Sequence, residues 1–202
     1  VCVRSSYNEE TAINHTTFEV KDAALCVYPP TSWALVGNNF NVDVIVDDVV
    51  DLFGFEFYLS YNTTMLDVLS VVIQPPFDKG PSPLIEIVEP DGYVHVASVL
   101  PPGSPPLSGS FPLVSITFRA VSLGRCSLDL YNTSLIDSML NPMVHISVDG
   151  YAFVVILGDV DGDGKVTMKD IFLLILHFGG KKGDSRYVAN CDINCDDVID
   201  MK

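Results

Sequence analysis

The fold is decided by two neighbouring segments, FNVDVIVD at residues 40–47 and LFGFEFYLSY at residues 52–61. In the first segment apolar and polar residues alternate, and in the second an apolar side chain stands at every other position. Successive side chains of a β-strand point to opposite faces, so each segment predicts a half-buried strand. The side chains that we expect in the core are Phe40, Val42, Val44 and Val46, and then Phe53, Phe55, Phe57, Leu59 and Tyr61.

Similar segments recur from about Leu25 to Leu157. They include YVHVASV (93–99), LVSITFRAV (113–121), RCSLDLY (125–131), VHISV (144–148) and YAFVVIL (151–157). Clusters of proline, glycine and asparagine separate them and predict turns. Many short strands joined by turns, without helices alternating between them, predict a mainly β fold of the β-sandwich type.

Composition and charge narrow the classes of function. The chain has 202 residues, 48% of them hydrophobic, which is enough for one sandwich-sized domain and a small appendage. A formal net charge of −15 would repel a phosphate backbone, so nucleic-acid binding is disfavoured, whereas many carboxylates suit calcium. The sequence has no apolar run of about eighteen residues that would predict a membrane span. Its four histidines are scattered and it carries no catalytic motif, so we expect no enzyme.

At Gly158 the strand pattern gives way to an acidic loop, GDVDGDGKVTMKD, and then to an apolar run, Ile171–Phe178, that predicts a helix. If Asp159 opens a calcium-binding loop, oxygen ligands fall at the alternate positions that such a loop uses, and Gly164 falls at its sharp turn. The sequence therefore predicts one calcium ion bound by the side chains of Asp159, Asp161, Asp163 and Asp170 and by the backbone carbonyl of Lys165.

The end of the chain, NCDINCDDVIDMK at residues 190–202, repeats this loop 33 residues later. Asp197 stands where the first loop has its turn glycine, and aspartate tolerates left-handed backbone better than most residues. A second calcium site is predicted at Asp192, Asn194, Asp196, Val198 (through its carbonyl) and Asp200. The last ligand position would be residue 203. Either the native chain continues with an acidic residue and a second helix, or this is a weak site closed by water or by a partner.

Three sequons for N-glycosylation favour an exported protein, because they exceed the number expected by chance. They begin at Asn14, Asn62 and Asn132. We therefore expect a secreted protein, extracellular or on the cell surface, from which the signal peptide has already been removed.

The five cysteines lack the paired spacing of zinc sites. Disulfides are the default in an exported chain, and Cys2–Cys26 is the pair that we expect, because it would tie down the N-terminal segment. A Cys191–Cys195 bond is a second candidate with demanding geometry. Cys126 is left over and is expected to be a small buried residue.

The duplicated D-x-D/N-x-D loop, with a helix only after it, resembles a dockerin domain over about residues 158–202. It departs from the family pattern at Asp197, at the two cysteines and at the chain end. The resemblance implies bound Ca²⁺ and a docking role for loop positions ten and eleven. In this sequence these positions are Met168 and Lys169, and in the repeat Met201 and Lys202. The same residues in both halves imply a two-fold docking surface.

The preceding region resembles a cohesin domain over roughly residues 24–157. The resemblance lies in NVDVIVDDVVDLFGFEFYLSYNTTMLDVLSVV (41–72), LVSITFRAVSLGRCSLDL (113–130) and SVDGYAFVV (147–155). It implies a nine-stranded jelly-roll β-sandwich with a sheet face that binds dockerins. We divide the chain into an N-terminal extension (1–23), a cohesin-like β-sandwich (24–157) and a dockerin-like tail (158–202) whose second half is incomplete.

Both resemblances imply assembly without catalysis. Residues 158–202 carry nine acidic and six basic side chains, a net charge of −3 that two calcium ions would bring to about +1, opposite −12 for residues 1–157. We expect an extracellular structural protein that self-associates by calcium-dependent docking. Its expected partners are other copies of itself or other cohesin- or dockerin-bearing proteins, and filaments are one expected product. The alternative is a cell-surface scaffold adaptor or a carbohydrate-binding module. Trp33 would then stack on a glycan, although a lone tryptophan more often lies in a core.

Overall fold

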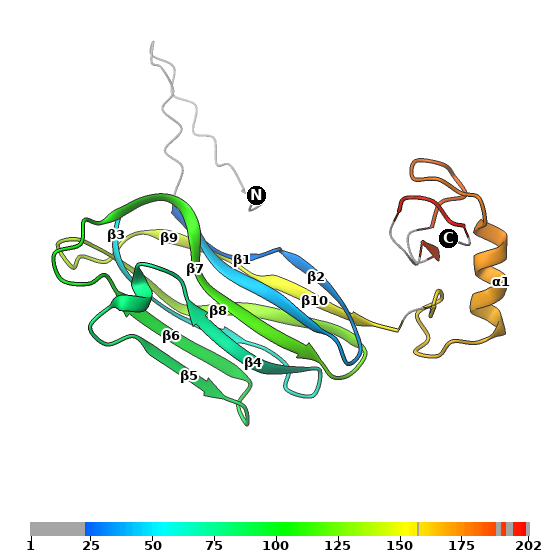
Figure 1. Cartoon of the computed structure of the whole chain (residues 1–202), viewed down its shortest axis with the longest axis horizontal. Helices are drawn as coiled ribbons and strands as arrows, with labels where there is room; N and C mark the ends of the chain where they lie inside the picture. The colour runs from blue at the N-terminus through cyan, green and yellow to red at the C-terminus, as the bar shows by residue number, and fades with distance from the viewer. Residues whose placement is uncertain (1–22, 157, 189–190, 193–195, 201–202) are drawn as a thin grey trace, which may run out of the picture.

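The computed structural model describes residues 23–156, 158–188, 191–192 and 196–200. Strands dominate these residues, and Figure 1 shows them as a sandwich that precedes the α-helix α1 (Met168–His177). The strands are β1 (Ala23–Tyr28), β2 (Thr31–Leu35), β3 (Asn39–Ser60), β4 (Leu66–Ile73), β5 (Leu84–Val88), β6 (Tyr93–Val99), β7 (Leu107–Ala120), β8 (Gly124–Asp137), β9 (His145–Val148) and β10 (Gly150–Val155). A short 3₁₀ helix, η1 (Phe77–Lys79), joins β4 to β5. No helix in the described part of the chain is long and apolar enough to cross a bilayer.

Strand β3 belongs to both layers of the sandwich. Its first half pairs with β1 and β7, and its second half pairs with β6 and β8. The strand bends from one layer into the other near Asp48 and Asp51, whose φ angles are +54° and +66°. Its register with β7 shifts on both sides of Val49. The two strands predicted at 40–47 and 52–61 are therefore one bent strand, because bulges let the pairing with β7 continue around the corner.

The pairing of the other strands defines the two layers. One layer runs β4-β7-β3-β1-β9, and the other runs β5-β6-β3-β8-β10-β2. The two parallel pairs, β1 with β9 and β2 with β10, join the start of the sandwich to its end. The described residues contain ten strands rather than the nine that the family resemblance implied.

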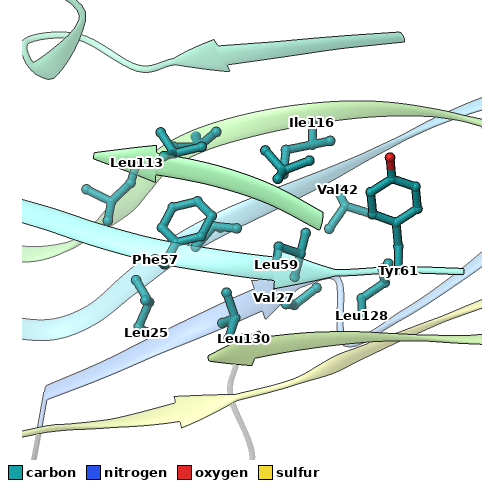
Figure 2. Packing of buried hydrophobic residues seen from close by; sticks show 14 of the residues in the cluster. Leu25, Val27, Val42, Phe57, Leu59, Tyr61, Leu113, Ile116, Leu128 and Leu130 are labelled. Atoms are coloured by element: carbon teal, nitrogen blue, oxygen red, sulfur yellow. The ribbon is translucent and has the colours of Figure 1, made fainter. Parts of the chain in front are cut away.

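The core lies between the layers, and the alternating residues of β3 contribute more buried side chains to it than any other strand. Val42, Val44, Val46, Phe57 and Leu59 are fully buried, as their alternation predicted. Figure 2 shows several of them beside Leu25, Leu113, Ile116, Leu128 and Leu130, which come from β1, β7 and β8.

Two core predictions need correction. Phe53 is only partly buried and its neighbour Leu52 is buried instead, because the register of β3 with β8 shifts between Leu52 and Gly54. Phe40 is also only partly buried, near the start of β3, where it packs against the edge of the core.

Candidate calcium loops and docking surfaces

The first loop folds around the carboxylate of Asp159. Its Oδ1 accepts hydrogen bonds from the backbone N–H groups of Gly162 (2.9 Å) and Asp163 (3.1 Å), and its Oδ2 accepts one from Gly164 (2.8 Å). Gly164 has a φ of +86°, the left-handed geometry that glycine adopts without steric cost. The turn glycine predicted from the sequence therefore stands at the sharp turn of the loop.

Asp170 links the loop to the start of α1. Its Oδ1 accepts from Val160 N (2.9 Å), and its Oδ2 accepts from Thr167 N (2.7 Å), while Thr167 Oγ1 accepts from Lys169 N (3.2 Å). This reciprocal capping box starts α1 at Met168, three residues earlier than the predicted helix. The backbone N–H of Thr167 is the main cause that lowers the pKa of Asp170 to about 2, so this carboxylate is charged at neutral pH.

Three of the predicted ligands come together. Carboxylate oxygens of Asp159, Asp161 and Asp170 all lie within 4.8 Å of one another. Asp163 is not part of this group; it is exposed, and its Oδ1 accepts a hydrogen bond from Lys165 N (3.0 Å). The sequence therefore located three of the four carboxylates together, and the role of Asp163 as a ligand stays a prediction.

The chemistry of this cluster fits a hard cation. Asp161 Oδ2 is buried and has no backbone donor, and it is in direct ion-pair contact with the Lys169 ammonium. A buried carboxylate oxygen needs a positive charge or a donor, and calcium prefers grouped carboxylate oxygens. The cluster of Asp159, Asp161 and Asp170 is thus suited to hold the predicted calcium ion, whose role would be to neutralise these charges.

The second loop reproduces the hydrogen bonds of the first. Asp192 is buried, and it accepts from Asp196 N (3.2 Å) and Asp197 N (2.9 Å), just as Asp159 accepts four and five residues further on. Asp196 Oδ1 accepts from Val198 N at 3.0 Å, the counterpart of the contact between Asp163 and Lys165. Asp197 has a φ of +67°, which matches the turn glycine. The repeat found in the sequence is therefore also a repeat of backbone geometry.

Parts of the predicted second site cannot be placed. Asn194, Met201 and Lys202 lie outside the described residues, while Asp200 is described and only partly buried. The ligand set of the second loop stays a prediction. Sequence reasoning missed Tyr187, whose hydroxyl donates to Asp192 Oδ2 at 2.8 Å.

The two loops share a small core. Val160, Cys191 and Ile199 are buried together, with Leu173 and Leu174 of α1 packed against them. The loops are also tied by the backbone, because Gly179 N donates to Ile199 O (2.8 Å) and Ile199 N donates to Gly180 O (2.9 Å).

The opposite side of α1 is exposed and apolar. Met168 is 76% exposed, Phe172 60% and Ile175 64%, and Ile171 and Leu176 are also exposed. Residues three, four and seven apart share one side of a helix, so these side chains form a continuous stripe. Of the predicted docking residues, Met168 belongs to this stripe, whereas the Lys169 ammonium contacts Asp161.

The outer face of the layer β5-β6-β3-β8 carries a cluster of aromatic rings that sequence reasoning did not find. The Tyr58 ring stacks on His95 with 3.9 Å between centroids, and it lies 5.2 Å from Tyr131 and 5.7 Å from Tyr93. His95 Nε2 lies 2.9 Å from Glu56 Oε1 on the neighbouring strand. Tyr58 is the cross-strand partner of both His95 and Tyr131, so the cluster depends on register, which no local pattern reveals.

A shallow cavity of about 210 Å³ adjoins this cluster on the same layer. It is lined by residues of β3, β6 and β8, including Glu56, Ala97 and Ser134. The face is therefore part aromatic, part acidic and indented.

Trp33 is 62% exposed on β2, so the expectation that a lone tryptophan lies in the core is wrong here. It stacks on Phe153, its partner on β10, with 4.6 Å between ring centroids. The guanidinium of Arg125 lies 3.9 Å from the centroid of Tyr151 next to them. One face of the Trp33 ring is thus covered by Phe153, and β2 is an edge strand.

The predicted glycosylation sites are partly placed. Asn62 and Asn132 are exposed, and Asn14 lies outside the described residues. In the Asn62 sequon, the Thr64 hydroxyl donates to Asn62 Oδ1 at 2.8 Å.

The cysteines differ in state. Cys26 is disulfide-bonded, but its partner lies outside the described residues, so the pairing with Cys2 stays a prediction. Cys126 and Cys191 are free and buried, and burial raises the pKa of both thiols. Cys126 is the small core residue that the sequence predicted, whereas Cys191 packs in the core of the tail as a free thiol, so the candidate Cys191–Cys195 bond is not formed.

Comparisons with known proteins agree with these two parts. The family model of the dockerin type I domain matches residues 157–202. No curated protein matches the chain.

Solved structures match the sandwich. A non-cellulosomal cohesin from the hyperthermophilic archaeon Archaeoglobus fulgidus has a TM-score of 0.58 at 17% identity, over 67% of this chain and 92% of its own. A chain of the type I cohesin–dockerin complex Coh-OlpC-Doc435 from Clostridium thermocellum has a TM-score of 0.60 at 16% identity, over 75% of this chain and 100% of its own. The cohesin CaCohA2 from Clostridium acetobutylicum has a TM-score of 0.59 at 16% identity, over 67% and 92%. The chain is thus a cohesin-like β-sandwich followed by a dockerin-like tail.

Proposed function

We propose that this protein is a non-catalytic extracellular assembly protein whose calcium-loaded tail docks on the sandwich of another copy. The observation that carries the proposal is the exposed apolar stripe of α1, because such a stripe is unfavourable in water unless a partner covers it. A helix with anchors at this spacing is a common recognition element for an apolar surface.

The surface that fits this stripe is the outer face of β5-β6-β3-β8. Its aromatic cluster of Tyr58, Tyr93 and Tyr131 offers the large, semi-polar rings that are enriched at interfaces. Glu56 and Glu86 add negative charge beside the rings, with His95 between them at 2.9 and 3.6 Å. A tail that has gained positive charge from calcium is drawn to such a face.

A second copy is the partner that the chain itself provides. One chain carries both the cohesin-like sandwich and the dockerin-like tail, so head-to-tail contacts repeat and generate a ring or, if the rotation does not close, a filament. Other proteins with cohesin-like or dockerin-like domains would fit the same two surfaces. The domain limits proposed for these units remain 24–157 and 158–202.

An extracellular location follows from the same proposal. Asn62 and Asn132 are exposed and accessible to glycosylation, and Cys26 is disulfide-bonded, as is usual outside the cytosol. Mass spectrometry of the protein from its native source should find glycan on at least one sequon.

The test uses two charge insertions in the full chain. Ile175→Asp places a carboxylate in the stripe of α1, and Val72→Asp places one on β4, where Val72 is also about half exposed. We expect the first variant to weaken calcium-dependent association at least about tenfold, in analytical ultracentrifugation, because hot-spot residues dominate interfaces. The second variant should associate like the wild type.

Two results would contradict the proposal. One is a wild-type protein that stays monomeric in millimolar calcium and binds no other cohesin-like domain. The other is association that persists after removal of residues 158–202, which would place the connector in another part of the chain.

A second candidate function rests on Trp33. Its exposure on an edge strand beside Arg125 favours a carbohydrate-binding module, because an open aromatic ring can stack on a sugar. Glycan-array binding that Trp33→Ala abolishes would support this candidate. The ring has only one open face, since Phe153 covers the other, and this is why we place docking first.

A further inference from the structure

Lys169 places a positive charge at the calcium cluster of the first loop. Its ammonium is in direct contact with Asp161 Oδ2. The Asp161 side chain is only 10% exposed, whereas that of Lys169 is 67% exposed. The buried partner of this ion pair is therefore the carboxylate, and the mobile, hydrated partner is the lysine.

The other two carboxylates of the cluster have backbone donors, and Asp161 Oδ2 does not. Asp159 accepts from three N–H groups and Asp170 accepts from those of Val160, Asp161 and Thr167. Asp161 Oδ2 accepts from no backbone N–H group, and its contact is with the Lys169 ammonium. Lys169 is thus the group that compensates the least satisfied oxygen of the cluster.

The backbone of Lys169 is fixed independently of its side chain. Its N–H donates to Thr167 Oγ1 at 3.2 Å as part of the helix cap. The ammonium can therefore leave Asp161 by side-chain rotation alone, without unwinding α1.

We propose that Lys169 is the internal counter-ion of the first loop, which holds Asp161 in the metal-free state and is displaced when calcium binds. An ammonium and a divalent ion cannot share one carboxylate oxygen without strong repulsion. Lys169 therefore competes with calcium and sets the affinity of the loop.

Displacement of Lys169 also changes the charge at the surface of the tail. Lys169 follows Met168, a member of the exposed stripe of α1, so its release by calcium adds a free positive charge beside the docking surface. This second step rests on the proposed docking function, whereas the competition at Asp161 requires only that the loop binds calcium.

Calorimetric titration of the full chain with calcium tests the competition. We expect Lys169→Met to bind calcium about fivefold more tightly than the wild type, and Lys169→Arg to remain near the wild type because it keeps the ion pair. Lys181→Met is the matched control, since it removes an exposed tail charge that has no contact with the cluster. It should change the affinity less than twofold, as a screened long-range effect.

Chemical acetylation followed by mass spectrometry tests the displacement. Without calcium Lys169 should react more slowly than Lys181, and saturating calcium should remove this difference. Equal affinities for wild type and Lys169→Met, or equal gains for Lys169→Met and Lys181→Met, would overturn the proposal. A wild-type chain that binds no calcium would instead overturn the metal site itself, and failure to associate would leave the competition at Asp161 intact.

Discussion

The sandwich and the tail are stabilised in different ways. The sandwich encloses a continuous core in which Phe57, Phe118 and Leu128 are fully buried. Within the part of the tail that the structure describes, the apolar centre consists of Val160, Cys191 and Ile199, and many backbone N–H groups there donate to carboxylates. Burial of apolar surface can stabilise the sandwich alone, whereas the tail has too little core and needs neutralisation of its acidic loops.

Removal of calcium should therefore have the largest effect, and only on the tail. We expect chelation to abolish a separate tail transition in differential scanning calorimetry, because metal-binding free energy contributes to the folding of a small domain. The transition of the sandwich should stay in place.

In saturating calcium, Asp161→Ala should no longer bind calcium tightly at the first loop. Its tail transition should therefore be lost, as in the wild type after chelation. Asp184→Ala is its control, since Asp184 is exposed and lies outside the carboxylate cluster. A single transition that shifts as a whole with calcium would show that the two parts fold as one unit.

A cavity in the core of the sandwich should have the converse effect. Phe57→Ala removes a fully buried ring and should lower the free energy of unfolding by about 3–5 kcal/mol in urea titrations. The calcium affinity of the tail should not change. Val50→Ala, at a side chain that is 70% exposed, should cost less than about 0.5 kcal/mol. A loss of calcium affinity in Phe57→Ala would contradict the independence of the two parts.

Sequence reasoning predicted the regular parts of both regions. The alternation in β3 identified Phe57 and Leu59 correctly because the two faces of that strand differ in polarity. The bend of β3 at Asp48 and Asp51 was not predicted. These residues adopt left-handed backbone geometry although they are not glycine, and no local sequence signal marks this.

In the tail, ligand spacing is local and located the cluster of Asp159, Asp161 and Asp170. The capping box of Thr167 was also visible as a T-x-x-D pattern, and it would have given the correct start of α1. The ring cluster around Tyr58 could not be predicted, because it joins residues of β3, β6 and β8 through register.

Loss of the helix cap at the start of α1 should give the smallest effect of these changes. Thr167→Ala removes the oxygen that accepts from Lys169 N and leaves the neighbouring Asp170 carboxylate with one donor fewer. Helix caps of this kind contribute about 1 kcal/mol, so calcium affinity measured by calorimetry should fall by about fivefold, since metal binding and folding of the tail are coupled. Thr167→Ser keeps the hydroxyl and should retain the wild-type affinity. The melting temperature of the sandwich should be the same in both variants. If Thr167→Ser loses as much affinity as Thr167→Ala, the methyl group rather than the hydrogen bond is the stabilising element, and the view that polar contacts hold the tail would need revision.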